Sequence, residues 1–400
     1  MTPPMTSAPR VLTPRRAAPA DSVRPTRAEI SLSHLRHNLT ELARIAGSPV
    51  WSVLKADAYG HGAKAVARTL ERAGSRGICV ALIEEGIELR EAGVVAPILV
   101  MGGHYGNAWP ELLRHELTPV LSRMDQVRSL AEEVRERGGA AHGVHIKVDT
   151  GMARLGVPLA ELESFAEVLC QHPELRPEGL MTHFASAESD AEFVELQLDR
   201  FERATRQLEQ LGLRFRVRHA ANTAALLTHP RARLDLVRAG IGLFGMAPGV
   251  HVVTTPGVAA AALRPVMRVR SEVISLRTLG VGASVGYGAT FRATRESRIA
   301  TLPMGYGDGL SRALSNRGQV LVRGRRAPIV GAVSMDLTSV DVTDIPGVTI
   351  GDEVVLLGSQ DGPCGSDTLS AEEIAAHTGS IAWEVLTGIS RRVPRFYRED

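Results

Sequence analysis

The spacing of hydrophobic and polar positions divides this chain into two long regions. From about residue 28 to residue 245, short apolar runs alternate with stretches in which apolar residues recur every three or four positions. The runs are typical of buried strands, and the recurring spacing is typical of amphipathic helices. Predicted strand and helix pairs include residues 50–56 with 62–74, 78–83 with 84–93, 144–151 with 159–173, and 179–185 with 190–212. About eight such units predict a TIM-type (β/α)8 barrel, with an open, doubly wound parallel sheet as the alternative.

Beyond about residue 255 the pattern changes to alternating strands separated by Gly, Pro and Asp turns, for example in residues 297–305 and 319–344. Only residues 370–379 have helical spacing there. This pattern predicts a β-rich C-terminal domain. We therefore expect a disordered tail over 1–27, a cofactor-binding barrel over 28–254 and a β-strand domain over 255–400. Flanking segments could complete the first barrel strand or helix.

Composition narrows the classes of function. The formal net charge is +2, aromatic residues make up 4% of the chain, and no long basic run is present. We therefore expect no nucleic-acid partner and no membrane partner. The three cysteines lie far apart and in no zinc-binding spacing, which favours a reducing cytoplasm without disulfides or metal. Arg15 and Arg16 are not followed by an apolar segment, so we interpret the start of the chain as a tail rather than an export signal.

Chemically reactive residues recur at the predicted strand ends, where TIM barrels place their catalytic groups. They are Lys55, Lys147, Asp149, Thr150, Arg154, His183, His219, Asn222 and Arg238. Lys55 follows an apolar run directly, and a desolvated lysine has a lowered pKa and a nucleophilic amine. A Schiff base with pyridoxal 5'-phosphate is then possible, and a lysine that simply reaches solvent is the alternative. The glycine-rich residues 238–245 and the segment 220–223 offer backbone N–H groups and a hydroxyl for a phosphate.

Eight segments in order resemble the bacterial alanine racemase family, a group of fold-type III pyridoxal phosphate enzymes, from about Ala28 to Tyr397. The most specific is VLKADAYGHG at residues 53–62. The others are KVDTGMARLG, THFASAE, RAGIGLFG, SVGYGATF, LPMGYGDG, VSMD and RRVPRFY. The resemblance implies a pyridoxal phosphate enzyme that interconverts L- and D-alanine and supplies D-alanine for the peptidoglycan cell wall.

The resemblance also implies roles for single residues. Lys55 would bind the cofactor and act as one base, and Tyr287 would be the second base, from the other subunit of a homodimer with shared active sites. Arg238 would face the pyridine nitrogen, and His183 would form a hydrogen bond with Arg238. The cofactor-binding set would be completed by Tyr59, Asn222, Thr223, Gly240 and Ile241.

The substrate side is implied in the same way. Arg154 and the backbone N–H of Met335 would bind the substrate carboxylate, and Tyr306 would narrow the entrance. Lys147, a residue carbamylated in many family members, would orient Arg154, and Asp336 would lie close to Tyr287. Arg391 stands where some members have a tyrosine that touches the phosphate.

Two other functions stay open at this point. A racemase of broader specificity, for serine or basic amino acids, would use the same groups. A non-enzymatic pyridoxal phosphate carrier would need Lys55 but not Tyr287. His219 is interpreted as a hydrogen-bonded core histidine.

Overall fold

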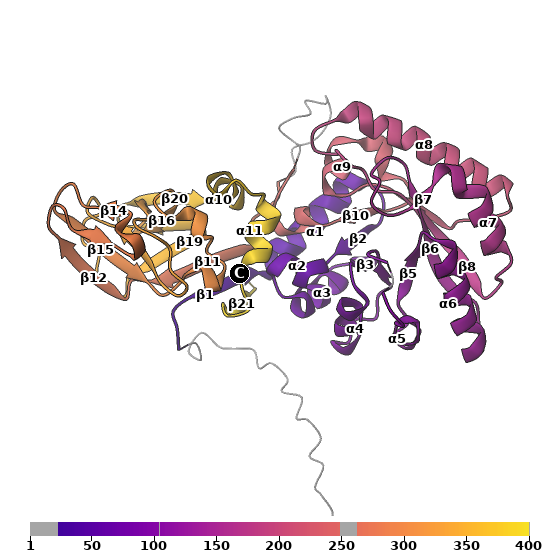
Figure 1. Ribbon diagram of the computed structural model, residues 1–400, viewed down its shortest axis with the longest axis horizontal. Helices are drawn as coiled ribbons and strands as arrows, with labels where there is room; N and C mark the ends of the chain where they lie inside the picture. Colours follow the sequence, from indigo (N-terminus) through magenta and orange to yellow (C-terminus); the bar gives the residue numbers. More distant parts are fainter. Residues whose placement is uncertain (1–22, 104, 249–261, 400) are drawn as a thin grey trace, which may run out of the picture.

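Eight parallel strands form a nearly closed barrel in the computed structural model, which describes residues 23–103, 105–248 and 262–399 (Figure 1). Their order is β10 (Val237–Ala239), β2 (Val50–Val53), β3 (Gly77–Val80), β4 (Ile98–Val100), β5 (Thr118–Leu121), β6 (His142–Asp149), β8 (Leu175–Met181) and β9 (Val217–His219). A short strand, β7 (Val157–Pro158), pairs with β6. The Arg238 backbone N–H donates to the Ala221 carbonyl at 3.0 Å, which joins the two ends of the sheet. The predicted barrel is confirmed over the open sheet.

Helices surround this barrel. They are α1 (Leu32–Ala46), α2 (Lys55–Gly60), α3 (Ala63–Arg72), α4 (Ile83–Glu91), α5 (Trp109–Arg114), α6 (Met124–Arg137), α7 (Leu162–Cys170), α8 (Ala191–Gln210) and α9 (Thr223–Thr228), with short 3-10 turns η2 (Leu159–Glu161), η3 (Pro230–Arg233) and η4 (Ile241–Phe244). Helix α1 shows how the sequence sets such a helix. Leu35, Leu39 and Leu42 fall on one buried face, Ser31 caps the first turn, and Gly47 ends the helix in the left-handed conformation.

The C-terminal region is rich in strands, as predicted, and its sheets extend away from the barrel (Figure 1). Its strands are β11 (Met267–Glu272), β12 (Ser275–Leu279), β13 (Ser284–Val285), β14 (Phe291–Arg292), β15 (Ser297–Leu302), β16 (Gln319–Val322), β17 (Arg325–Pro328), β18 (Thr338–Asp341), β19 (Glu353–Gly362), β20 (Gly365–Leu369) and β21 (Arg395–Arg398). The 3-10 turns are η5 (Tyr287–Ala289), η6 (Tyr306–Asp308) and η7 (Arg312–Leu314). The predicted helix is α10 (Ala371–Thr378). A second helix, α11 (Ala382–Gly388), was not expected, because its seven residues are too few to show a helical period.

The first strand, β1 (Arg27–Ser31), belongs to the C-terminal sheet and not to the barrel. It pairs antiparallel with β11 and parallel with β21. We expected the apolar run at this position to open the barrel, and that assignment is wrong. Local spacing reveals a strand but not its partners, which here lie hundreds of residues away.

The end of the predicted tail also departs from expectation. Thr26 is fully buried, and its hydroxyl lies 2.8 Å from that of Ser271 and 2.8 Å from the carbonyl oxygen of Pro303. Arg24 forms an ion pair with the buried Asp308 at 2.8 Å. Packing therefore begins before residue 28. The remainder of the predicted tail, residues 1–22, and the predicted boundary at 254–255 lie outside the described residues.

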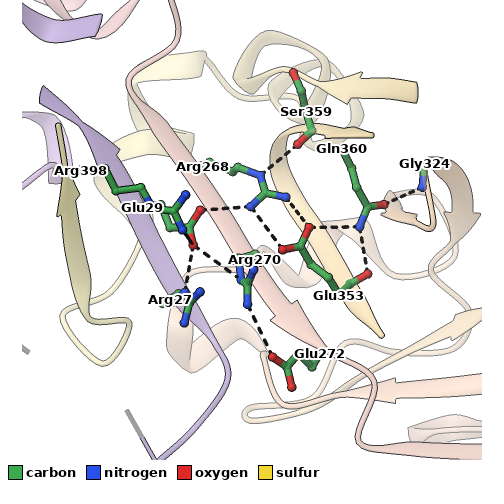
Figure 2. A network of polar contacts seen from close by, with 10 residues as sticks. All are labelled: Arg27, Glu29, Arg268, Arg270, Glu272, Gly324, Glu353, Ser359, Gln360 and Arg398. Carbon is green, nitrogen blue, oxygen red and sulfur yellow. Dashed lines mark hydrogen bonds and ion pairs between the residues drawn. The ribbon is translucent and has the colours of Figure 1, made fainter. Parts of the chain in front are cut away.

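A network of charged side chains fixes β1 within its sheet, as Figure 2 shows. The Glu29 side chain is only 4% exposed and pairs with Arg27 at 3.0 Å, Arg268 at 3.1 Å and Arg398 at 2.5 Å. Glu353 of β19 accepts from Arg268 on the other side. A buried carboxylate is tolerated because several guanidinium groups compensate its lost hydration. The network therefore ties both ends of the described chain to the same sheet.

Candidate active site

The carboxyl ends of the barrel strands bring predicted residues of the cofactor and substrate sites together. Lys55 follows β2, Lys147 lies in β6, Arg154 follows β6, His183 follows β8, and Arg238 lies in β10. Their charges act on one another: Arg154 lowers the pKa of Lys55, and Arg238, Arg154 and Lys55 all lower that of Lys147. Burial is the first cause in both cases and brings the pKa of Lys147 to about 8. The cluster carries excess positive charge and suits anionic ligands.

Lys55 is exposed at the mouth of the barrel in the single chain, where we had expected it to have little access to water. Desolvation by the surrounding protein still lowers the pKa of its amine. Beyond Lys55 the backbone forms a left-handed turn, with φ between 52° and 55° from Ala56 to Tyr59. Each non-glycine residue in this conformation costs roughly 1–2 kcal/mol. Strain of this kind persists where surrounding contacts over-determine it, and it clusters at functional sites.

Arg238 is the most enclosed cation of the cluster, with 2% of its surface exposed. Its guanidinium donates to the carbonyls of Thr182 and Ala220, both at 2.9 Å. The expected hydrogen bond to His183 is present, at 3.3 Å to Nδ1. A shorter one, of 2.7 Å, reaches Nδ1 of His219. Burial lowers the pKa of Arg238 to about 10, so the group keeps its charge at neutral pH.

His219 is a buried, hydrogen-bonded histidine, as predicted, and together with His145, which the sequence did not reveal, it forms a second layer behind Arg238. A guanidinium can only donate, so Nδ1 of His219 is the acceptor and its proton lies on Nε2. That Nε2 donates to Nδ1 of His145 at 2.9 Å. Burial lowers the pKa of both rings, to about 4 for His145, and keeps them neutral. The two rings hold Arg238 from behind without adding charge.

The predicted phosphate residues surround the start of α9 and the turn after β10. The Thr223 hydroxyl accepts from the Gly240 N–H at 3.0 Å and from the Gly242 N–H at 3.2 Å. Asn222 caps α9 by accepting from the Ala225 N–H at 2.9 Å. A Cβ at Gly240 would lie 2.5 Å from the Tyr59 hydroxyl, so glycine allows this close approach. Ile241 begins the 3-10 turn that follows.

The remaining predicted residues, Tyr287, Tyr306, Met335 and Asp336, belong to the β-rich region of the chain. The exposed fractions are 76% for Tyr287, 43% for Tyr306 and 52% for Met335. Backbone N–H groups of residues 306 and 307 donate to the carbonyls of residues 334 and 335, which brings η6 against this loop. Asp336 pairs with Arg392 at 2.7 Å. In Figure 1, β14, next to the turn that carries Tyr287, lies at the end of this region away from the barrel.

Glu85 is a site residue that our sequence reading missed. It lies in the first turn of α4, and its Oε1 accepts from the Ala56 N–H at 2.6 Å. Its Oε2 accepts from the N–H groups of Ala81 and Leu82, at 2.8 and 3.1 Å. Glu85 stands three residues after the N-cap residue Leu82, which is the spacing of a capping glutamate, although Leu82 is not the serine or threonine that usually accompanies it.

The side chains at the barrel mouth fit pyridoxal phosphate. They supply the amine of Lys55, a buried guanidinium, the Thr223 and Tyr59 hydroxyls, and an excess of positive charge for a phosphate. Within the described ranges no group of three His, Cys, Asp or Glu residues could hold a metal ion. Among the same residues, no helix has the length and apolar character needed to cross a bilayer.

Comparison with known proteins identifies the chain. Residues 30–248 match the alanine racemase N-terminal domain, and residues 266–397 match the alanine racemase C-terminal domain. An alanine racemase of Sorangium cellulosum is 57% identical over 385 residues, which are 94% of this chain and 100% of that protein. An alanine racemase of Halothermothrix orenii is 43% identical over 94% of this chain and 97% of its own.

Solved structures agree with this match. The alanine racemase of Streptomyces coelicolor A3(2) is 35% identical, with a TM-score of 0.87 over 95% of this chain and 100% of that one. The alanine racemase of Bartonella henselae, solved with covalently bound pyridoxal phosphate, is 29% identical, with a TM-score of 0.83 over 94% and 99% of the two chains. Fold and matches together define an isomerase of the racemase class. The chain belongs to the alanine racemase family.

Proposed function

We propose that this protein is a cytoplasmic homodimer that interconverts L-alanine and D-alanine with pyridoxal phosphate and so supplies D-alanine for peptidoglycan. The observation that carries this proposal is Lys55, a strand-end amine of lowered pKa within a cluster of cations. An amine in that setting is suited to bind an aldehyde cofactor whose phosphate the surrounding donors would hold. The chain would divide near residues 254 and 255 into the barrel and the β-strand domain, preceded by the tail.

The residues of the chain would share the chemistry at the substrate Cα. Pyridoxal phosphate, when bound, makes the Cα proton acidic by withdrawing electrons. Lys55 would exchange that proton on one face and Tyr287 on the other, as inversion at carbon requires. Arg238 keeps its charge and would prevent protonation of the pyridine nitrogen, which limits side reactions. His183 would support Arg238.

The other predicted residues would bind the two anionic groups. Tyr59, Asn222, Thr223, Gly240 and Ile241 would hold the phosphate. The substrate carboxylate would be bound by Arg154, which Lys147 would orient, and by the backbone N–H of Met335. Tyr306 would narrow the entrance, and Asp336 would support Tyr287 from nearby.

A second copy of the chain completes this site in the proposal. Tyr287, Tyr306 and Met335 belong to the β-rich region and are exposed in the single chain. Exposed tyrosine and methionine side chains are typical of surfaces that become buried at an interface. If the β-strand domain of one subunit covers the barrel mouth of the other, each dimer gains two shared sites.

The test is to incubate the purified protein with L-alanine and, separately, with D-alanine, and to separate the enantiomers. We expect both reactions to reach the same mixture. Parallel reactions with serine, lysine and arginine measure specificity. Rates with these amino acids equal to the rate with alanine would replace alanine racemase with a broader racemase. No inversion of any amino acid, alanine included, would leave a cofactor carrier.

A further inference from the structure

The left-handed turn after Lys55 carries two residues of the proposed site, one at each end. Lys55 immediately precedes the turn, and Tyr59 is the last non-glycine residue of the turn with a positive φ. A change of backbone direction within this turn would therefore move the amine and the Tyr59 hydroxyl together. What holds the turn in place determines the geometry of the site.

Several polar groups of the turn bind residues close to it in the sequence. The Ala58 N–H donates to the Leu54 carbonyl at 2.9 Å, and Asp57 Oδ1 accepts from the Ala63 N–H at 2.7 Å. Nδ1 of the buried His61 donates to the carbonyls of Ala58 and Tyr59. Two groups at the ends of the segment bind elsewhere: the Ala56 N–H donates to Glu85 of another strand–helix unit, and the Gly60 carbonyl accepts from Arg395 of β21.

Glu85 therefore links two neighbouring strand ends. Its Oε1 binds the turn after β2, while its Oε2 binds the Ala81 and Leu82 N–H groups after β3. β2 and β3 are adjacent in the barrel, so the carboxylate bridges them at the face where Lys55 emerges. Hydrogen bonds to a carboxylate are about twice as strong as neutral ones.

We propose that Glu85 is a positioning residue of the active site, whose carboxylate fixes the left-handed turn and thereby the directions of Lys55 and Tyr59. This inference rests on the proposed function and adds a residue to it. Glu85 touches neither substrate nor cofactor and acts through the backbone of Ala56.

The charge of Glu85 gives this position a second effect. The charged and titratable groups that act on Lys55 are Glu85, Arg154, Lys147 and His183. Glu85 is the acidic member of this set, and it raises the pKa of Lys55 against the lowering effects of burial and Arg154. Removing its charge would lower the pKa of Lys55 further. The acid side of the pH profile would then shift to lower pH.

The experiment uses the full-length, cofactor-loaded protein in three variants. Glu85→Ala removes the bridge, Glu85→Gln keeps an acceptor for the Ala56 N–H without the charge, and Glu84→Gln is the control at the exposed neighbour on the same helix. Two quantities are measured: the dissociation constant of pyridoxal phosphate, followed by its visible absorbance on dilution, and the pH dependence of kcat, which reports the groups of the substrate complex, where Lys55 would act as a base.

We expect Glu85→Ala to weaken cofactor binding about tenfold and Glu85→Gln to weaken it less. The acid-side midpoint should move to lower pH in Glu85→Gln, and Glu84→Gln should match the parent in both measurements. Binding by Glu85→Ala equal to that of Glu84→Gln overturns the proposal, as does an unmoved midpoint in Glu85→Gln. If Glu85→Ala does not fold, Glu85→Gln decides the question through its midpoint and its affinity.

Failure of this inference is distinguishable from failure of the proposed function. The parent protein would still bind pyridoxal phosphate and invert alanine if Glu85 proved irrelevant. A parent protein that inverts no amino acid contradicts the proposed function directly.

Discussion

The two regions that carry the predicted site residues differ in how far one chain organises them. At the barrel mouth, Arg238 is buried and held by four hydrogen-bond partners, and its neighbours come from several strand ends. In the β-rich region, Tyr287 and Met335 are exposed at turns. The barrel therefore holds its groups in place before any partner arrives. In the proposed dimer, the exposed β-rich residues would meet substrate only at the barrel mouth of a second subunit.

The largest expected effect comes from removing the predicted cofactor-binding amine of the barrel. Lys55→Ala should lower racemisation by about 10⁴-fold or more, because the residue would serve both as cofactor ligand and as base. The visible absorbance of the bound cofactor should disappear as well. Retention of an unchanged visible spectrum would contradict the assignment of Lys55.

Removing the predicted base of the β-rich region should lower the racemisation rate less, and by different factors in the two directions. Tyr287→Phe keeps the ring and removes the hydroxyl, and we expect a loss of about 10²–10⁴-fold in the affected direction. The colour of the cofactor should remain. Separate rates from L-alanine and from D-alanine are the measurement, and losses of equal size in both single-turnover directions would argue against two bases.

Mixing the two variants tests whether the two regions meet between subunits. If Lys55→Ala and Tyr287→Phe subunits exchange at random, half of the dimers contain one of each, and each of these has one intact site of two. Activity should then recover to about a quarter of the parent value. Each variant alone, taken through the same dissociation and reassociation, is the control. No recovery, with exchange verified by a tag on one variant, would mean that the two residues act within one chain.

The smallest effect concerns stability on the barrel side. Burial lowers the pKa of Lys147 from 10.5 to about 8 in the folded chain. Below pH 8 the amine is charged in both folded and unfolded chains, so its desolvation destabilises the fold. Between pH 8 and 10.5 the unfolded chain binds more protons at this residue than the folded chain does, so the contribution of Lys147 to the free energy of unfolding rises with pH.

Lys147→Met should therefore raise the melting temperature in CO2-free buffer near pH 7.5, and this gain should shrink as the pH approaches 10.5. The matched control is Lys64→Met, at a half-exposed lysine of α3. A constant difference between Lys147→Met and the parent across this range would contradict the lowered pKa.

The sequence predicted the barrel well because its short apolar strands and amphipathic helices alternate regularly and neighbouring units follow one another in the chain. It also placed Lys55, Lys147, His183 and Arg238 at strand ends, which the barrel then brings together. Contacts between residues far apart in the sequence could not be predicted. No local pattern shows that β1 pairs with β11 and β21, or that His219 reaches Arg238.

Glu85 illustrates a different limit of sequence reading. Its capping position was visible, but its second role depends on the left-handed turn of a neighbouring unit. Tyr287 shows the opposite case. The family resemblance implied its role, whereas its exposed position in a single chain does not indicate one. Residue type and local spacing identify candidates, and three-dimensional neighbours decide what each one does.

The pairing of β1 has a consequence for the order in which this protein matures on the ribosome. Glu29 leaves the ribosome long before Arg268, which lies 239 positions later, and Arg398, which lies 369 positions later. The barrel strands can pair as they are synthesised, whereas the sheet that contains β1 must wait for the last residues of the chain. Through most of its synthesis, the nascent chain would therefore carry β1 without its partner strands and Glu29 without its arginine partners Arg268 and Arg398. Loss of only the final strand would leave this early segment without its parallel neighbour.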